Sequence, residues 1–358
     1  MTTLPEIDAP GSGRAAGAAH GEAARALVRD HHAIVVERLG GLGVTLEQAR
    51  ERALPFRAAT AEVAPWLADE VDGVGAGAGL ADGDAWLLQL RAELTVAPGR
   101  HEPECTTVAL AGAAVAGGPL AAQNVDLPPA YRPLLIALRR SGDGARPDLL
   151  TITPAGQVGH HGMNVHGLTV MANFLHAKGW RVGLPRYLTT RIGLACATVS
   201  EAADAIARVP RSGPRNLLLV DAHDAVDLET TPEAVVPIAP EAGRIVHANH
   251  FEGPLAAQDT ASEAWLENSR SRAARLRELL DLAPPPDVRS LAVLLGDRHG
   301  VPHALSHHPE DDERGDVETV ASTIAEVEAR RLWVCAGPPD RGEHLPYPVR
   351  AAAGREAA

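Results

Sequence analysis

The chain has 358 residues, of which 45% are hydrophobic and 22% charged, a composition typical of globular proteins. With 33 Lys and Arg against 46 Asp and Glu, its net charge is −13 at pH 7, which argues against binding to nucleic acid or anionic lipid. It has no apolar run of the roughly 20 residues that span a bilayer and no secretory leader pattern. We therefore expect a cytoplasmic protein with no nucleic-acid partner and no membrane partner.

The amino-terminal part is predicted to be helical after a short tail. Residues 1–22 lack hydrophobic periodicity and are predicted to be a mobile, disordered tail. From residue 23 to residue 94, apolar side chains recur at helical spacing, with a glycine-rich interruption over residues 73–79. Residues 23–104 are therefore predicted to form a segment of two to four helices.

Strand signals dominate after residue 104. Apolar, β-branched runs separated by turn residues predict strands at 105–110, 120–125, 134–138, 149–152, 168–174, 216–221, 225–229, 244–249, 320–327 and 331–335. Helical periodicity predicts helices at 188–209, 261–282 and 288–296. Strands in hairpin-linked blocks between helices favour antiparallel sheets covered by helices, an α+β fold.

Histidine and cysteine are the residue types most open to a chemical interpretation. The sixteen histidines include adjacent pairs, but adjacent side chains point in different directions and make poor metal sites, so we expect neither a metal nor a cofactor. Cys196 and Cys335 lie in apolar segments and are predicted to be small buried hydrophobic residues. Cys105 follows the polar residues 100–104 and begins a strand, so it is either a candidate nucleophile or a packing residue.

Around Cys105, short motifs occur in the order of one enzyme family. The motifs are Glu104-Cys-Thr-Thr-Val108, Leu120-x-x-Gln-Asn-x-Asp126, Gly162-Met-Asn-x-His-Gly-Leu168, Leu184-Pro-Arg-Tyr-Leu188, Asp224-Ala-Val-Asp-Leu-Glu229, Arg244-Ile-Val-His-Ala-Asn-His-Phe251 and Glu318-Thr-Val-Ala-Ser322. Over residues 80–345 the chain resembles the acyl-coenzyme A:6-aminopenicillanate acyltransferase (isopenicillin-N acyltransferase)-like family of self-processing cysteine N-terminal-nucleophile (Ntn) hydrolases.

This resemblance implies a fold, a cleavage and a set of catalytic residues. The fold is an αββα sandwich of antiparallel sheets, preceded by the helical segment. Self-cleavage between Glu104 and Cys105 makes residues 23–104 a pro-segment or small chain and residues 105–358 the catalytic large chain. Cys105 is then the nucleophile and, through its freed α-amine, the base. The resemblance assigns Asn249 to the oxyanion, Asp126 to the amine of Cys105, and Ser322 to orienting the nucleophile.

The implied activity moves an acyl group, through a Cys105 thioester, to an amine or to water. Its partners are a small-molecule acyl donor, either a thioester or an amide, and an amine acceptor or water, and the two cleaved fragments are expected to stay associated. Two other functions remain open: an unprocessed, non-catalytic Ntn-fold binding protein, and a papain-type thiol hydrolase. For single residues, a turn remains an alternative for Asn249 and Asp126, and an ordinary strand position for Ser322.

Overall fold

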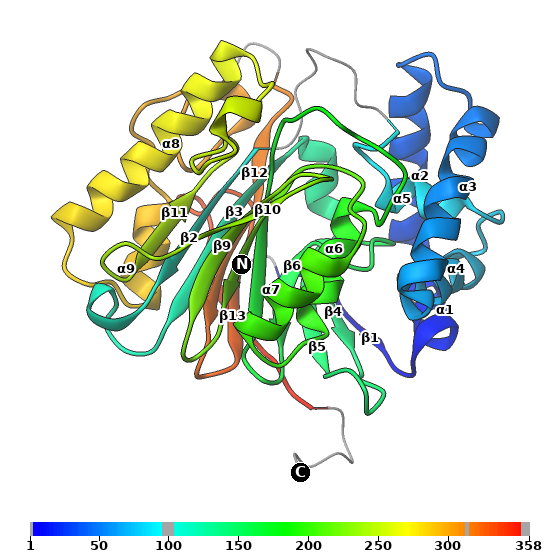
Figure 1. Ribbon diagram of the computed structural model, residues 1–358, viewed down its shortest axis with the longest axis horizontal. Coiled ribbons are helices and arrows are strands. Elements are labelled where there is room, and N and C mark those ends of the chain that lie inside the picture. The colour runs from blue at the N-terminus through cyan, green and yellow to red at the C-terminus, as the bar shows by residue number, and fades with distance from the viewer. Residues whose placement is uncertain (1–2, 95–103, 312–314, 352–358) are drawn as a thin grey trace.

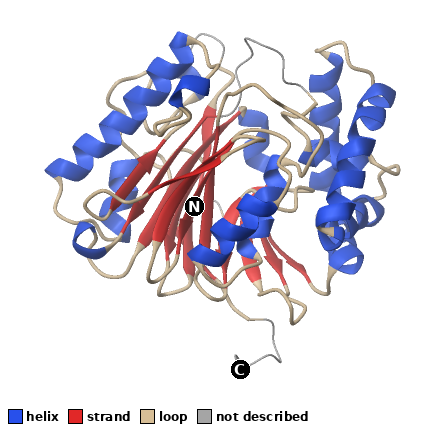
Figure 2. Ribbon diagram, in the orientation of Figure 1, coloured by secondary structure: helices blue, strands red, loops and turns tan. Residues whose placement is uncertain are grey.

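Two β-sheets lie face to face between layers of helices in the computed structural model, which describes residues 3–94, 104–311 and 315–351 (Figures 1 and 2). Almost all neighbouring strands are antiparallel, because most strands are joined in sequence order by hairpins. The predicted α+β class and the αββα arrangement are therefore confirmed. In the described part of the chain, every helix is too short or too polar to cross a membrane.

The first sheet carries Cys105 on an interior strand. Its six strands are, in spatial order, β11 (Arg244–His247), β2 (Glu104–Leu110), β3 (Leu120–Leu127), β12 (Glu318–Glu326), β13 (Arg331–Ala336) and β14 (Leu345–Pro348). Strand β2 pairs with β11 on one side and with β3 on the other, and Cys105 lies opposite Val125. Because side chains alternate between the two faces of a strand, Cys105 and Val125 point toward the second sheet, where both belong to the core between the sheets.

The second sheet has eight strands. In spatial order they are β1 (Glu6–Ala9), β4 (Leu135–Arg140), β5 (Leu149–Pro154), β6 (His161–Asn164), β7 (Thr169–Phe174), β8 (Arg215–Val220), β9 (Ala225–Thr230) and β10 (Val235–Ile238). Strand β1 is parallel to β4, and the other pairs are antiparallel. The central strands are buried on both faces, which explains why their sequences read as continuous apolar runs.

Helices cover the outer face of each sheet. The six-stranded sheet is covered by α8 (Glu263–Leu282) and α9 (Val288–Leu295), and the eight-stranded sheet by α6 (Arg186–Leu194) and α7 (Val199–Arg208). The single helix predicted over 188–209 is thus two helices. Thr198 separates them, because its hydroxyl accepts the backbone N–H of Glu201 at 3.2 Å and so caps α7. Short 3₁₀ helices span Gly112–Ala114, Pro129–Leu134, Ala256–Gln258 and Pro309–Asp311.

The amino-terminal region is more ordered than its composition indicates. It forms β1 and then α1 (Gly13–Ala23), α2 (Arg25–Gly40), α3 (Leu46–Val63), α4 (Pro65–Ala78) and α5 (Asp84–Gln89). The prediction of a disordered tail over residues 1–22 is corrected for β1 and α1. Glycines allow α1 and α4 to pack backbone against backbone. A Cβ on Gly17 would lie 1.9 Å from the backbone carbonyl oxygen of Glu70, and a Cβ on Gly73 would lie 2.2 Å from the backbone carbonyl oxygen of Arg14. The glycine-rich stretch that interrupts the sequence pattern is therefore a helix-packing surface.

Candidate active site

Cys105 is a buried thiol at the beginning of β2. Its side chain is 3% exposed, and its backbone is paired with β3. Burial, reinforced by the negative charge of Asp126, raises the pKa of the Cys105 thiol to about 11. The thiol is therefore protonated at neutral pH and needs a base before it can act as a nucleophile. Residues 95–103, the end of the predicted pro-segment, lie outside the described part of the chain.

Asn249 contacts the backbone of Cys105 directly. It follows β11, two residues beyond the end of that strand, so the strand predicted over 244–249 is shorter than expected. Its Oδ1 accepts the backbone N–H of Cys105 at 2.7 Å, and its Nδ2 donates to the carbonyl of Phe174 at 3.0 Å. The backbone N–H of Asn249 donates to the hydroxyl of Ser269 at 2.6 Å. The structure thus brings two of the predicted site residues, Cys105 and Asn249, into contact.

Arg272 is a site residue that the sequence analysis missed. It lies on α8, is fully buried, and donates from Nη1 to the carbonyl of Cys105 at 2.8 Å and from Nη2 to Oδ1 of Asn249 at 2.9 Å. Its Nε donates to Asn268 at 2.8 Å. A signal was present in the sequence: this arginine occupies the buried stripe of an amphipathic helix, in helical spacing with the buried Leu276 and Leu280. A charged residue at such a position needs partners in the interior.

Asn173 is a second missed contact of Cys105. From β7 in the opposite sheet, its Nδ2 donates to the carbonyl of Cys105 at 3.3 Å and to the carbonyl of His247 at 3.2 Å. The carbonyl of Cys105 therefore accepts hydrogen bonds from two layers of the fold: from Asn173 in the opposite sheet and from Arg272 on the outer helix α8. These contacts fix the backbone at the candidate nucleophile.

Asp126 lies across the strand pair from the predicted cleavage point. In the register of β2 and β3 it is opposite Glu104, while Val125 is opposite Cys105, so the side chains of Asp126 and Cys105 leave opposite faces of the sheet. Asp126 is fully buried, and its Oδ1 accepts the hydroxyl of Thr319 at 2.6 Å. Its position beside the Glu104 backbone is compatible with a role at the amine of Cys105, which stays a prediction.

Ser322 lies two strands away from Cys105 in the six-stranded sheet. It lies on β12, which is separated from β2 by β3, and its register partners are Asn124 and Cys335. Its hydroxyl lies 3.0 Å from Nε2 of His344. An orienting role for Ser322 would act through the sheet rather than by the hydrogen bond observed here, and it also stays a prediction.

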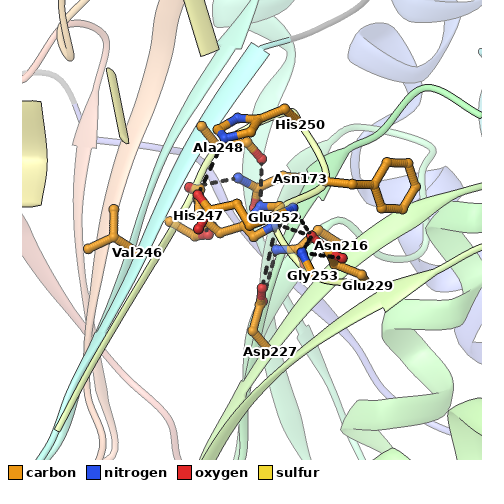
Figure 3. Close-up of polar contacts among 12 residues, drawn as sticks. Asn173, Asn216, Asp227, Glu229, Val246, His247, Ala248, His250, Glu252 and Gly253 are labelled. Carbon is orange, nitrogen blue, oxygen red and sulfur yellow. Dashed lines mark hydrogen bonds and ion pairs between the residues drawn. The ribbon is translucent and has the colours of Figure 1, made fainter. Parts of the chain in front are cut away.

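A buried ionic cluster holds the loop that carries Asn249. His247 on β11 points toward β9, where its Nε2 lies 3.0 Å from Oε1 of Glu229 and 3.8 Å from Oδ2 of Asp227 (Figure 3). Glu229 also accepts the backbone N–H groups of Glu252, at 2.5 Å, and Gly253, at 3.1 Å. The cluster therefore fixes both ends of the loop over residues 248–253, and with it Asn249.

The charges of this cluster shift the pKa values of its members. Burial alone would lower the pKa of His247, but the charge of Asp227 and the hydrogen bond to Glu229 outweigh burial and raise it to about 9. Burial raises the pKa of Asp227 to about 6, against the opposing effects of His247 and the hydrogen bond from Asn216. A protonated His247 between two carboxyl groups is therefore the expected form at neutral pH.

Comparison with known proteins gives one family match and several related proteins. The family model for acyl-coenzyme A:6-aminopenicillanic acid acyl-transferase matches residues 115–341, a range that begins after Cys105. The 40 kDa form of acyl-coenzyme A:6-aminopenicillanic-acid-acyltransferase from Emericella nidulans is 32% identical over 213 residues, which is 58% of this chain and 58% of that protein. The chain thus spans little more than half the length of this relative.

Solved structures with partial likeness include an acid amidase and a penicillin acylase. An N-acylethanolamine-hydrolyzing acid amidase ortholog from Caenorhabditis elegans has a TM-score of 0.46 and 16% identity, covering 62% of this chain and 92% of that one. Penicillin V acylase from Agrobacterium tumefaciens has a TM-score of 0.43 and 15% identity, covering 65% of this chain and 83% of that one.

Proposed function

Because this chain belongs to the acyl-coenzyme A:6-aminopenicillanic acid acyl-transferase family, we propose that it is a self-cleaving acyltransferase or amidohydrolase with Cys105 as its nucleophile. The enzyme takes an acyl group as a Cys105 thioester and passes it to an amine or to water. The observation that carries this proposal is the setting of Cys105: a buried thiol at the start of a central strand, whose backbone nitrogen donates to Asn249.

Self-cleavage proceeds through the peptide bond between Glu104 and Cys105. The sulfur of Cys105 attacks the carbonyl carbon of Glu104, the C–N bond breaks, and the thiol proton ends on the departing nitrogen. Water then hydrolyses the resulting thioester, which gives a carboxylate on Glu104 and restores the thiol. The products are residues 1–104 and residues 105–358, and the second begins with a free α-amine.

The freed amine supplies the base that the buried thiol requires. A thiol with a pKa of about 11 is protonated at neutral pH, whereas an α-amine has an ordinary pKa of roughly 7.7–8.0 and can accept the thiol proton near that pH. Oδ1 of Asn249 already accepts the N–H of this nitrogen at 2.7 Å, so it supports an amine held in the same place. Asp126, across the strand pair, is proposed to tune the basicity of that amine.

Asn249 is also proposed to stabilise the oxyanion of the tetrahedral intermediate. Its Nδ2 carries two hydrogens, one of which donates to the carbonyl of Phe174, and we assign the other to the oxyanion. Arg272 fixes the orientation of this amide, because it donates to Oδ1 and so leaves Nδ2 as the end that donates. The arrangement is a preorganised neutral donor in a buried site, which is the setting in which such donors contribute most.

The substrates proposed are small molecules. The acyl donor is a thioester or an amide, and the acceptor is an amine or water. Transfer and hydrolysis use the same Cys105 thioester and differ in the acceptor that the site holds. After cleavage the two fragments are proposed to stay associated, because residues 6–9 of the first fragment form a strand of the eight-stranded sheet.

Mass spectrometry of the purified protein and of three cysteine variants tests the proposal. Wild type is expected as fragments of 104 and 254 residues that gain an acyl group on Cys105 with an activated acyl donor. Cys105→Ala is expected to stay as one chain, and Cys105→Ser to cleave slowly or not at all. Cys196→Ala, which changes a half-buried thiol on the outer side of the eight-stranded sheet, is the matched control and is expected to behave as wild type.

The same experiment separates the two alternative functions. An uncut chain that never takes up an acyl group would indicate a non-catalytic binding protein. An uncut chain that is active, and that loses activity when one histidine is replaced, would indicate a papain-type thiol hydrolase. An active wild-type enzyme with an intact bond between Glu104 and Cys105 would overturn the proposed mechanism.

A further inference from the structure

One stripe of helix α8 holds Asn249 at three of its atoms. The buried residues Trp265, Ser269 and Arg272 recur at i, i+4 and i+7 on this helix, which covers the outer face of the six-stranded sheet (Figure 1). Nε1 of Trp265 donates to the backbone carbonyl of Asn249 at 3.3 Å, and the hydroxyl of Ser269 accepts the backbone N–H of Asn249 at 2.6 Å. Arg272 donates to Oδ1 of Asn249 at 2.9 Å. The helix therefore holds the backbone of this residue as well as its side chain.

These contacts matter because Asn249 lies beyond the end of its strand. Strand β11 ends at His247, so Asn249 belongs to the loop that follows. The Ser269 contact is the shortest of the three that the helix makes to this residue. It fixes the main chain from which the side chain projects, and therefore the place of the amide that meets the backbone nitrogen of Cys105.

The hydroxyl of Ser269 has a second partner, His250. Its Oγ lies 2.7 Å from Nδ1 of His250, and both side chains are buried. A serine hydroxyl has one hydrogen, and because its oxygen already accepts the N–H of Asn249, that hydrogen is best placed toward Nδ1. This arrangement requires Nδ1 of His250 to be an unprotonated acceptor.

Glu252 favours the tautomer that makes Nδ1 an acceptor. Burial lowers the pKa of His250 to about 4 against the opposing charge of Glu252, so the imidazole is neutral at neutral pH and carries one proton. Nε2 of His250 lies 3.5 Å from Oε1 of Glu252, which favours that proton on Nε2. In the resulting series each hydrogen has an acceptor: Nε2–H faces Glu252, the Ser269 hydroxyl faces Nδ1, and the Asn249 N–H faces Ser269.

We propose that Ser269 and His250 are positioning residues of the active site, which hold the backbone of Asn249 so that its side-chain amide meets the Cys105 nitrogen and the oxyanion. The proposal rests on the proposed function and adds to it two residues that act through Asn249. Displacement of a catalytic group by about 1 Å can cost about 10²-fold in rate, so one hydrogen bond to this backbone is sufficient to affect catalysis. Ser269 is fully buried and bonded on both sides, which suits holding rather than reacting.

Acylation of Cys105 by the S-hexanoyl thioester of N-acetylcysteamine, followed by mass spectrometry of self-cleaved protein, tests these roles. In Ser269→Ala the maximal acylation rate is expected to fall about tenfold or more, because the oxyanion donor is displaced. The thioester concentration that gives half of this rate is expected to change less, because the substrate contacts remain. Ser271→Ala, at a partly exposed position two residues further along α8, is the matched control and is expected to react as wild type does.

Variants of His250 separate hydrogen bonding from packing. His250→Asn keeps an oxygen acceptor close to the place of Nδ1 and is expected to retain most of the acylation rate, whereas His250→Leu is expected to lose about as much as Ser269→Ala. Thr198→Ala is the stability control, because it removes a hydroxyl that also accepts a backbone N–H, at the start of α7. It is expected to lower the Tm and leave the acylation rate unchanged. The same result in Ser269→Ala would show a structural role only and overturn the proposal.

A ¹⁵N NMR spectrum of the histidine side chains is a measurement that needs no catalysis. The signal of His250, assigned by its absence in His250→Asn, is expected to show the Nε2–H tautomer, and Ser269→Ala is expected to shift its Nδ1 resonance. An Nδ1–H tautomer at neutral pH would overturn the proposal. Wild type that takes up no acyl group would overturn the proposed function itself, whereas equal acylation rates in wild type and Ser269→Ala would overturn only the roles of Ser269 and His250.

Discussion

The side-chain oxygen of Asn249 lies 2.7 Å from the backbone nitrogen of Cys105 and accepts its hydrogen. These residues are 144 positions apart in the chain, and the sheet pairing of β11 with β2 brings them together. The same Asn249 oxygen accepts a hydrogen bond from Arg272, so two donors, the Cys105 N–H and the Arg272 guanidinium, fix the orientation of the side-chain amide. A contact to this particular nitrogen matters if the nitrogen becomes an α-amine, because the amine is then held where the thiol can reach it.

Replacement of Asn249 separates its two proposed roles. Asn249→Ala removes the oxyanion donor and the acceptor for the Cys105 nitrogen, and we expect kcat to fall by about 10²–10³, the usual cost of one oxyanion donor. Asn249→Asp keeps an acceptor for the amine but has no N–H donor, so kcat is expected to fall while self-cleaved protein still accumulates. Steady-state kinetics and mass spectrometry of both variants make the comparison. A kcat equal to that of wild type in Asn249→Ala would remove this residue from the site.

The ionic cluster of His247 and Glu229 is expected to position Asn249. Glu229→Gln weakens the hold on the backbone N–H groups of Glu252 and Gly253 and leaves His247 with a weaker partner. We expect kcat to fall by about tenfold or more, with a smaller change in KM, because a small displacement of a catalytic group is costly. Glu233→Gln is the control, since Glu233 forms a largely exposed pair with Arg181. If Glu229→Gln changed KM alone, the cluster would belong to substrate binding instead.

Sequence patterns predicted the elements around Cys105 well, because each is a local feature. The strands that became β2 and β3 have β-branched and apolar residues bounded by turns, and the helix that became α8 has a regular apolar stripe. The short strand β10 was missed, since it lies at the edge of its sheet and is only half buried. Strand β1 and helix α1 were missed because alanine and glycine carry little periodicity, and their role appears only when α4 packs against them.

The candidate site was predictable only in part, because some of its contacts join elements that are far apart in the sequence. Cys105 and Asn249 were predicted as site residues from motifs, whereas the hydrogen bonds of Arg272 and Asn173 to Cys105 depend on the pairing of elements that are distant in sequence. Arg215 shows the limit most clearly: in the sequence it precedes an apolar strand like many surface arginines, and only the folded protein shows that its side chain is buried.

Stability should fall as the solution becomes alkaline. The folded-state pKa of His247 is raised to about 9 from an ordinary 6.5, so protonated His247 stabilises the fold fully below pH 6.5, and this contribution is lost as the pH rises through 9. Asp227, with its pKa raised to about 6 by burial, acts in the same direction between pH 3.8 and pH 6. Urea midpoints at pH 7 and pH 9.5 measure the loss, which is expected to be smaller in His247→Gln. An equal loss in both proteins would assign the pH dependence to other groups.

Glu70 is expected to be a main link between the amino-terminal helices and the sheets. From α4 it accepts hydrogen bonds from Arg140 of β4 and Arg191 of α6, each at 2.8 Å to Oε1, and all three side chains are buried. Burial would raise its pKa, but the two arginines outweigh burial and lower it to about 2. The stabilisation by ionised Glu70 is therefore present above its ordinary pKa of 4.5 and is lost as the pH falls through 2.

Glu70→Gln should consequently destabilise the protein severely. It leaves two buried guanidiniums without their counter-charge, and breaking a buried ionic pair in this way costs about 3–5 kcal/mol. Urea unfolding at pH 7 measures the change, and Glu62→Gln, at an exposed position of α3, is the control.

If the chain cleaves before Cys105, the two wild-type fragments are expected to elute together in size exclusion, because β1 and α4 still bind the sheets. The Glu70→Gln fragments are expected to separate at a lower urea concentration than the wild-type fragments. Equal stability of Glu70→Gln and Glu62→Gln would show that packing alone holds the amino-terminal helices against the sheets.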